Sequence, residues 1–209
     1  MYRKLSDDRL NDMLRAGIDE FAEKGFAGAS LANIAKRAGL SVGVIYKYYE
    51  EKESFFLECV RYSLNDLNNV LTEVAGKSDS LEESLRSVVK TLIAYSHENR
   101  NINRIYNEIA SGRGEMSVML AREIEDISAL VYTDLVRKAK ESGMCRSDAD
   151  PALFAFFFDS LFMMLQFSYS CEYYRERLKL YCGEEIFEDD EKMERELMRF
   201  LSGALGVTG

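Results

Sequence analysis

The chain has 209 residues, of which 47% are hydrophobic and 30% charged, and its formal net charge is −9. This size and composition allow a substantial buried core, in one large domain or two small ones. A single proline and many Leu, Met, Glu and Lys residues favour an all-α fold. No apolar run reaches the roughly 20 residues that span a bilayer, and the amino terminus has no apolar secretion segment. We therefore expect a cytoplasmic protein without a membrane partner.

The charge is distributed unevenly along the chain. Residues 1–49 carry a net charge of +2, whereas the remainder carries −11. Residues 29–49 contain three basic residues and no acidic one. Because an acidic surface repels nucleic acid, only the amino-terminal part is suited to contact DNA.

An apolar stripe predicts a first helix that ends at Gly25. The stripe consists of residues at helical spacing, namely Leu10, Met13, Leu14, Ile18, Phe21 and Ala22. Such a helix can pack over the two short helices that follow, so that three helices share a small core.

Residues 29–49 predict two short helices joined by a tight turn, the pattern of a helix-turn-helix. Gly39 ends the first helix, because glycine tolerates a positive φ. We expect the side chains of Ser30 and Ser41 to accept backbone N–H groups at the starts of the two helices. The apolar face of the first helix consists of Leu31, Ile34, Ala35 and Ala38.

The second short helix has an inner and an outer face. Ile45 and Tyr49 are four residues apart and can face the first helix. Gly43 adds no bulk on the outside, and Val42 or Val44 could touch thymine methyl groups. The remaining displayed side chains are Tyr46, Lys47 and Tyr48. An ordinary helical hairpin with a solvated tyrosine face explains the same spacing.

Residues 7–55 resemble the amino-terminal domain of TetR-family transcriptional regulators, and several offsets match together. The matching positions are Gly25-Phe26, Ala29-Ser30-Leu31, Ile34-Ala35, Ala38-Gly39-Leu40-Ser41, Gly43, Ile45-Tyr46 and Lys52-Glu53. The resemblance implies a homodimer that binds a palindromic operator on double-stranded DNA. It also implies a larger carboxy-terminal domain that binds a small-molecule effector and changes DNA affinity.

The resemblance implies a set of DNA contacts by position. Tyr46, Lys47 and Tyr48 would face DNA, Ser30 and Gly43 would approach its backbone, and Lys52 would meet a phosphate. With the outer valines and the second cap, the expected contacts are Ser30, Ser41, Val42, Gly43, Val44, Tyr46, Lys47, Tyr48 and Lys52. Two positions depart from the family: Val42 is often basic there, and Glu51 replaces a capping Ser, Asn or Asp. Both departures predict fewer phosphate contacts.

The rest of the chain also has helical periodicity. A long connector helix is expected from Lys52 to about Leu71, and Asp150-Pro151 marks a later helix start as N-cap and first helical residue. The other predicted helices cover about 81–95, 101–109, 118–139, 153–167 and 193–204. We therefore predict a three-helix head, residues 1–50, and a larger effector-binding and dimerisation domain, residues 51–209.

The predicted helix 153–167 is apolar almost all round, which indicates burial on more than one side. The last helix carries an apolar stripe as well, through Leu197 and Phe200. These two helices could form a four-helix bundle with a symmetry mate. The resemblance likewise implies that the last two long helices form a dimer interface.

Two polar residues interrupt the apolar helix seven positions apart. Asp159 and Gln166 project from one face, with Met163 between them, and buried polar groups need partners. They could orient an effector beside Phe158 and Phe162. Hydrogen bonds in the core or at the dimer interface explain them equally well. Side chains on other helices that could line the same cavity are Tyr62, Tyr95, Tyr106 and Met119, although each is also a typical core residue.

The sequence offers little for catalysis or metal binding. His97 is the only histidine, and no nucleophile elbow, phosphate-binding loop or dinucleotide motif accompanies it. The four cysteines are widely spaced without a Cys-x-x-Cys pair, which indicates reduced thiols. We expect no enzymatic activity, no metal and no cofactor. The alternatives to a DNA-binding regulator are an all-α enzyme and a helical scaffold protein.

Overall fold

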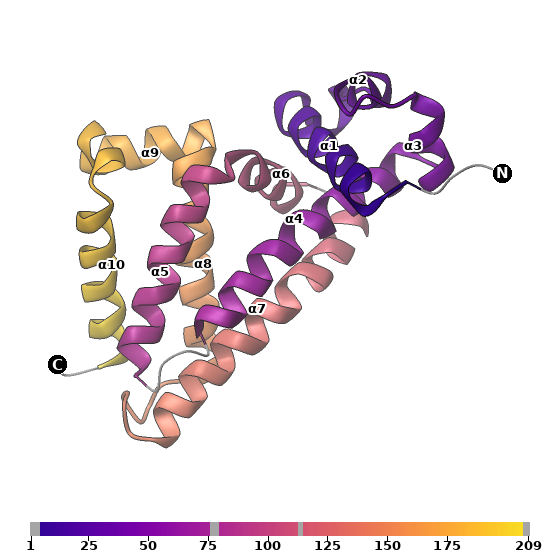
Figure 1. Cartoon of the computed structure of the whole chain (residues 1–209). Helices are drawn as coiled ribbons and strands as arrows, with labels where there is room; N and C mark the ends of the chain where they lie inside the picture. The colour runs from indigo at the N-terminus through magenta and orange to yellow at the C-terminus, as the bar shows by residue number, and fades with distance from the viewer. Residues whose placement is uncertain (1–4, 76–79, 113–114, 207–209) are drawn as a thin grey trace.

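The computed structural model describes residues 5–75, 80–112 and 115–206, and this part of the chain is helical apart from its turns (Figure 1). The all-α prediction is therefore confirmed. The helices are α1 (Asp7–Gly28), α2 (Leu31–Arg37), α3 (Val42–Tyr48), α4 (Lys52–Ala75), α5 (Leu81–Glu98), α6 (Arg100–Ala110), α7 (Glu115–Glu141), α8 (Pro151–Ser170), α9 (Glu172–Cys182), the 3₁₀ helix η1 (Glu184–Glu188) and α10 (Asp190–Leu205).

The molecule has a small head and a larger body (Figure 1). Helices α1, α2 and α3 form the head, and α4 runs from it into the body, where it packs along α7. Helix α5 packs between α4 on one side and α8 and α10 on the other. Helix α6 contacts α1 as well as α8, so it lies at the junction of head and body.

Gly25 interrupts α1 where the sequence predicted its end. Its φ of 67° breaks the helical path, and residues 26–28 continue after the kink. A Cβ at this position would lie only 3.2 Å from Oε1 of Glu108 on α6. That same oxygen accepts a hydrogen bond of 2.7 Å from the backbone N–H of Phe26. Glycine therefore provides both the positive φ and the close approach of α1 to α6.

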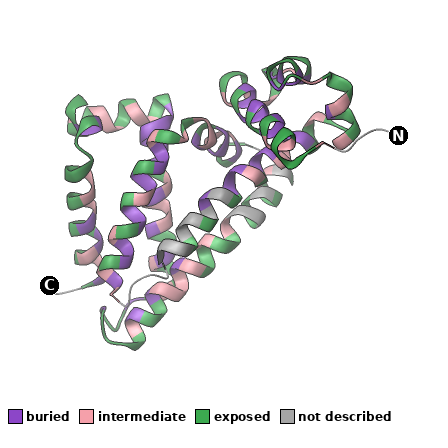
Figure 2. Cartoon of the chain, viewed as in Figure 1, coloured by how far each residue is buried: buried purple, intermediate pink, exposed green. Residues whose placement is uncertain are grey.

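The buried apolar side chains form two clusters. Figure 2 marks the buried positions along the helices of the head and the body. The first joins the head to the start of α4 and to α6, and includes Phe21, Ile45 and Phe55. The second lies inside the body between α5, α7, α8 and α10, and includes Leu92 and Leu201. Since the first cluster continues past residue 50, α4 is held rigidly by the head. The division into residues 1–50 and 51–209 stays a prediction.

On α7 the sequence periodicity predicts a buried stripe that includes Val118, Ile127 and Ala139, and the structure corrects part of it. Tyr132, Val136 and Ala139 are buried, whereas Val118 and Ile127 are 56% and 39% exposed. Two apolar stripes overlap on this helix, and periodicity alone does not tell which one faces the core. The correct stripe carries polar residues that the sequence analysis missed.

Helix α8 begins as predicted. The Asp150 carboxylate accepts the backbone N–H groups of Ala152 and Leu153 at 3.0 and 3.1 Å. By length and mean hydropathy Pro151–Ser170 could cross a membrane, although Asp159 and Gln166 interrupt its apolar run, as the sequence showed. In the fold, however, residues 165–171 are all buried by protein. Helix α9 was not predicted; none of its residues is fully buried, and Tyr174 and Leu178 are the partly buried side chains by which it packs against the two core clusters.

Candidate nucleic-acid interface and interior polar cluster

The turn between α2 and α3 is held by backbone bonds and by α1. Gly39 has a φ of 62°, as the sequence predicted, and the N–H of Leu40 donates to the carbonyl of Ala35 at 2.8 Å. Arg9 on α1 donates from its guanidinium to the carbonyl of Gly39 at 2.9 Å. These contacts fix the crossing of α2 and α3 before any partner binds.

The predicted serine caps were wrong. Neither Ser30 nor Ser41 caps its helix through its side chain. Instead the carboxylate of Glu20, which is 1% exposed, accepts the backbone N–H of Ser30 at 3.3 Å and the amide of Asn33 at 3.2 Å. An acidic group from α1 thus replaces the local cap, which sequence spacing could not reveal.

Helix α3 buries one face and displays the other. Ile45 is fully buried, while Tyr46 is 53% exposed. A Cβ added to Gly43 would meet only the Ser41 hydroxyl, at 4.0 Å, so no internal contact requires glycine there. The other expected contacts on this helix and its cap differ in exposure: Ser41, Val42 and Lys47 are exposed and Val44 is half-buried.

The two tyrosines at the end of α3 have internal partners. Tyr48 is half-buried, and its hydroxyl accepts the backbone N–H of Leu5 at 2.6 Å. The ring of Tyr49 lies 5.1 Å from that of Phe55, and burial raises the pKa of its hydroxyl to about 12. Tyr49 closes the head core, as its position implied. Tyr48 joins α3 to the chain preceding α1, a role that the sequence analysis did not foresee.

The basic side chains of the head also differ in their surroundings. Arg37 is paired with Glu23 at 2.8 Å and with Glu20 at 3.3 Å, so its charge is largely compensated. The ammonium of Lys52 lies 3.4 Å from the carbonyl of Ala27 and 5.0 Å from the centre of the Phe26 ring. Lys52 therefore fastens the start of α4 to the end of α1. Lys47 stays on the exposed surface of α3.

Residues 13–59 match the model of a family described as bacterial regulatory proteins, tetR family. The chain is also 25% identical over 149 residues to the biofilm operon icaADBC HTH-type negative transcriptional regulator IcaR of Staphylococcus aureus. The alignment covers 71% of this chain and 79% of IcaR. The chain belongs to the TetR family of transcriptional regulators.

Two solved structures show that the whole TetR-family fold is present. A tetR-family bacterial regulatory protein from Rhodococcus RHA1 has a TM-score of 0.75 at 18% identity, covering 98% of this chain and 100% of that one. FadR from Bacillus subtilis, in complex with stearoyl-CoA, has a TM-score of 0.73 at 15% identity, covering 92% and 97%. At these identities the likeness concerns the fold alone.

The body of this TetR-family protein contains a polar cluster between α6, α7 and α8. The hydroxyl of Tyr106 donates to Oε1 of Glu125 at 2.6 Å, and Ser128 hydrogen-bonds to Asp159. Burial raises the pKa of Asp159 to about 7, and the nearby charge of Glu125 acts in the same direction. Tyr132 is buried beside these groups, 3% exposed.

The structure brings together only part of the predicted effector set. Asp159, Met163 and Gln166 share one face of α8, and Tyr106 approaches Asp159 from α6. Phe162 borders this group, because its ring lies 5.5 Å from that of Tyr132, and Phe158 packs in the body core. The residues of the set that lie elsewhere are Tyr95, which donates to the Ser63 carbonyl at 3.4 Å, Met119, which is 37% exposed, and Tyr62.

The sequence analysis missed Glu125, Ser128 and Tyr132, which lie at helical spacing on α7. That spacing is a detectable signal. A second stripe on the same helix is more apolar, so hydrophobicity alone predicts that the second stripe is the buried one.

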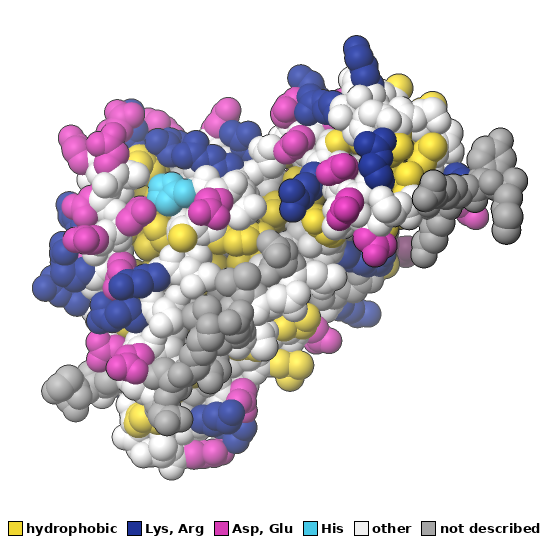
Figure 3. Space-filling view, viewed as in Figure 1, with side chains coloured by type: hydrophobic (Ala, Val, Ile, Leu, Met, Phe, Trp, Pro, Cys, Tyr) yellow, Lys and Arg dark blue, Asp and Glu magenta, His cyan; other side chains and the backbone are white. Residues whose placement is uncertain are grey.

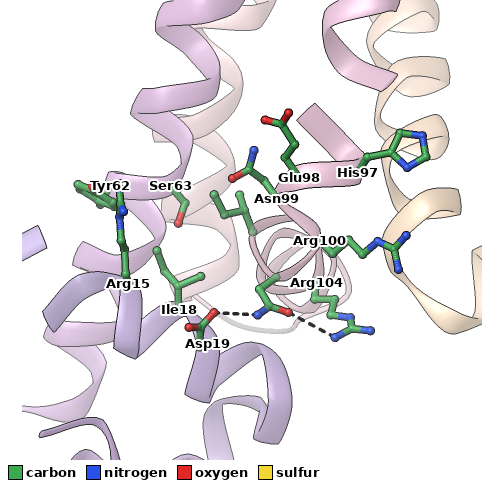
Figure 4. Close-up of a pocket in the computed structure, with 12 residues that line it drawn as sticks. Arg15, Ile18, Asp19, Tyr62, Ser63, His97, Glu98, Asn99, Arg100 and Arg104 are labelled. Carbon is green, nitrogen blue, oxygen red and sulfur yellow. Dashed lines mark hydrogen bonds between the residues drawn. The ribbon is translucent and has the colours of Figure 1, made fainter. Parts of the chain in front are cut away.

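Tyr62 instead lines a polar crevice of about 690 Å³ between α1, α4 and the junction of α5 with α6 (Figure 4). In the crevice Asn101 donates to Asp19 at 2.8 Å, which links α6 directly to α1. His97, visible as the one histidine on the surface in Figure 3, lies 3.0 Å from Asp190 on α10. This pair gives His97 a structural contact between α5 and α10.

The cysteines of the described chain are free, and only Cys182 is exposed. Burial raises the pKa of the Cys171 thiol to about 11 and that of Cys59 well above its ordinary value. Both groups are therefore held as unreactive thiols. Among the residues that the structure describes, no cluster of three or more potential ligands could hold a metal ion.

Proposed function

We propose that this TetR-family regulator is a homodimeric repressor that binds a palindromic operator and is released by a small, largely apolar ligand. The observation that carries the proposal is the outward face of α3, where Tyr46 and Lys47 are exposed on a helix fixed by Ile45 and by the Arg9 contact to the turn. A rigid helix with such side chains suits base-edge and phosphate contacts in the major groove. The negative regulator IcaR supports repression as the outcome.

Dimerisation is proposed through α8 and α10. Leu153, Phe156 and Phe157 on α8 and Phe200 on α10 are each more than half exposed. An apolar groove of about 370 Å³ runs between the two helices. Surfaces of this kind are unfavourable in a monomer, and a second copy related by a two-fold axis would cover both at once. The two recognition helices would then lie about one DNA turn, roughly 34 Å, apart.

Coupling between ligand and DNA is proposed to run through α6 and α4. Tyr106 and Glu108 are two residues apart on α6: the first contacts Glu125 on α7, and the second binds the Phe26 N–H of the head. A ligand that displaces α6 would therefore shift the head. Helix α4 transmits the same movement, because its first half is part of the head core.

The effector is proposed to bind on the inner face of α8 beside Asp159 and Gln166. Met163 lies between these residues, and Phe158 and Phe162 supply apolar surface behind them. FadR, which shares the fold, is in complex with stearoyl-CoA, so this architecture accommodates a ligand with a long apolar part. Residues 1–50 and 51–209 would act as the DNA-binding and effector domains of a cytoplasmic protein with no enzymatic activity.

Selection of bound sites from a random pool of duplex DNA tests the DNA-binding part of the proposal. A palindromic consensus and an affinity that falls steeply with salt are expected, since phosphate contacts release counterions. Lys47→Ala should weaken binding, whereas Lys192→Ala, which changes an exposed lysine on α10, is the matched control. Failure to enrich any sequence would overturn the proposal.

A further inference from the structure

The half-buried carboxylates of Glu125 and Asp159 share a site without a compensating base among the described residues. The partners that the structure gives them are hydroxyl groups: Tyr106 donates to Glu125 at 2.6 Å, and Ser128 lies 3.4 Å from the other carboxylate oxygen and bonds to Asp159. Within residues 5–75, 80–112 and 115–206, neither carboxylate forms an ion pair with lysine or arginine. The site therefore concentrates negative charge inside the body.

Aromatic rings border this pair of carboxylates. Burial raises the pKa of the Tyr106 and Tyr132 hydroxyls, and the nearby charges of Glu125 and Asp159 act in the same direction. The ring of Tyr132 lies 5.5 Å from that of Phe162, and it is 3% exposed. Aromatic faces attract cations through their quadrupoles, and the attraction grows when water is excluded. The carboxylates and the aromatic rings thus both favour a positively charged ligand.

Gln166 supplies an independent indication that a ligand belongs here. It is only 5% exposed, and its Oε1 accepts no hydrogen bond in the described part of the chain. It lies on the same face of α8 as Asp159, seven residues away. Its Nε2 donates to the carbonyl of Phe162 at 3.3 Å, so the unsatisfied atom is the oxygen alone. A buried acceptor without a donor is unfavourable, and a ligand N–H would satisfy it.

We propose that the effector is an apolar amine, bound as its ammonium ion between Glu125 and Asp159 with its apolar part against Tyr132 and Phe162. The proposal rests on the proposed function, since it names the chemical class of ligand for the same site. An ammonium group would supply the missing positive charge and a donor for Gln166. An anionic group in this place would be repelled by both carboxylates.

The protonation of Asp159 also fits a cationic ligand. Burial holds the pKa of its carboxyl near 7, so the pair carries a proton for part of the time at neutral pH. A bound ammonium would displace this proton and keep both carboxylates ionised, because an opposite charge at close range favours the charged form.

Calorimetry with matched probes tests the inference at neutral pH. The first set is 4-phenylbutylamine, 4-phenylbutanol and 4-phenylbutyrate, and the second is 1-naphthylmethylamine, 1-naphthalenemethanol and 1-naphthoate. Each set keeps a closely similar apolar skeleton and changes the charge. We expect the amine of at least one set to bind tenfold or more tightly than its alcohol, about 1.4 kcal/mol, and the acid to bind most weakly.

Glu125→Gln and Asp159→Asn should each weaken amine binding about tenfold, or by about 1.4 kcal/mol, and leave alcohol binding unchanged. The Glu125→Gln variant keeps an acceptor for the Tyr106 hydroxyl, so the local hydrogen bond is preserved. Asp126→Asn, which changes an exposed carboxylate on the same helix, is the matched control. Equal affinity for amine and alcohol, absence of amine binding in both sets, unchanged amine affinity in both variants, or parallel loss of alcohol binding would each overturn the inference.

The outcome is distinguishable from failure of the proposed function. Operator binding by the ligand-free protein tests the latter directly. Intact operator binding without amine selectivity refutes only the choice of ligand class, whereas loss of operator binding refutes the regulator itself.

Discussion

The head and the body use their polar side chains in opposite ways. In the head, Glu20 and Glu23 pair with Arg37, and Tyr46 and Lys47 are exposed. In the body, Glu125 and Asp159 are turned inward without a basic partner among the described residues. The acidic side chains of the head thus have a basic partner, whereas the two carboxylates of the body have none among the described residues. A DNA-binding surface can be rigid. A ligand site in the body, as proposed above, would be stabilised when a bound ligand compensates its charge.

The prediction with the largest expected effect tests whether the body must dimerise before the head can bind operator DNA. Phe200→Glu places a charge on the exposed apolar face of α10, where Phe200 is 62% exposed. We expect monomers in sedimentation and loss of detectable operator binding, because one head reads only half a site. Leu201 is fully buried, so Leu201→Glu should instead unfold the body, which thermal melting distinguishes. A stable dimer of the Phe200 variant would move the interface elsewhere.

The second prediction concerns the uncompensated charge of the body. The pKa of Asp159 is raised from 3.8 to about 7, by burial first and by Glu125 second, while Ser128 opposes the shift. The native state therefore holds the proton more tightly than the unfolded state, and the free energy of unfolding falls as pH rises from about 4 to about 7. A shift of this size corresponds to at most roughly 4 kcal/mol.

Asp159→Asn removes the cost of ionising this carboxyl in the folded state. The free energy of unfolding of the variant should therefore rise relative to that of the wild type as pH increases from about 4 to about 7. The groups around Asp159 are Glu125 and Tyr132 on α7 and Tyr106 on α6, all of which stay in place. Urea melts at several pH values measure the difference, with Asp126→Asn as the control. If the difference in the free energy of unfolding between variant and wild type does not increase with pH, Asp159 is not the group that titrates.

The third prediction concerns the exposed surface of the head. Tyr46→Ala and Lys47→Ala should each cost about 1–3 kcal/mol of operator binding, the usual value of one base or phosphate contact. Lys47→Ala should also reduce the dependence of binding on salt, whereas Tyr46→Ala should change base preference at one position. Neither variant should lower the melting temperature appreciably, since both side chains are exposed. Wild-type affinity in both would exclude the outer face of α3 as the reading surface.

The same contrast explains how far the sequence could be interpreted. The head was predictable because its elements are local: Gly39 ends α2, and Ile45 and Tyr49 are one helical turn apart. Its errors arose where a distant residue intervened, as when Glu20 accepted the Ser30 N–H at the start of α2 or Leu5 donated to Tyr48. Each of these contacts joins different elements of the head, and helical spacing carries no information about them.

The body was harder because its site combines three helices. Asp159 and Gln166 were recognisable as polar interruptions of an apolar helix. Glu125 became meaningful only once α7 was seen to turn Tyr132 and Val136 toward the core. The fold class and most helices therefore follow from periodicity, whereas the rotation of α7 depends on packing against α4 and α8.

The prediction with the smallest expected effect concerns a Cβ added at Gly43, which should change folding stability and operator affinity differently. Gly43 lies in α3 with open space around an added Cβ, so Gly43→Ala should stabilise the helix by up to about 1 kcal/mol through propensity alone. If the DNA backbone approaches this glycine, the same methyl group must weaken operator binding. Stability and affinity would then change in opposite directions, which melting and fluorescence anisotropy measure separately. An alanine at position 43 that binds operator as well as glycine would show that α3 reads DNA with its side chains only.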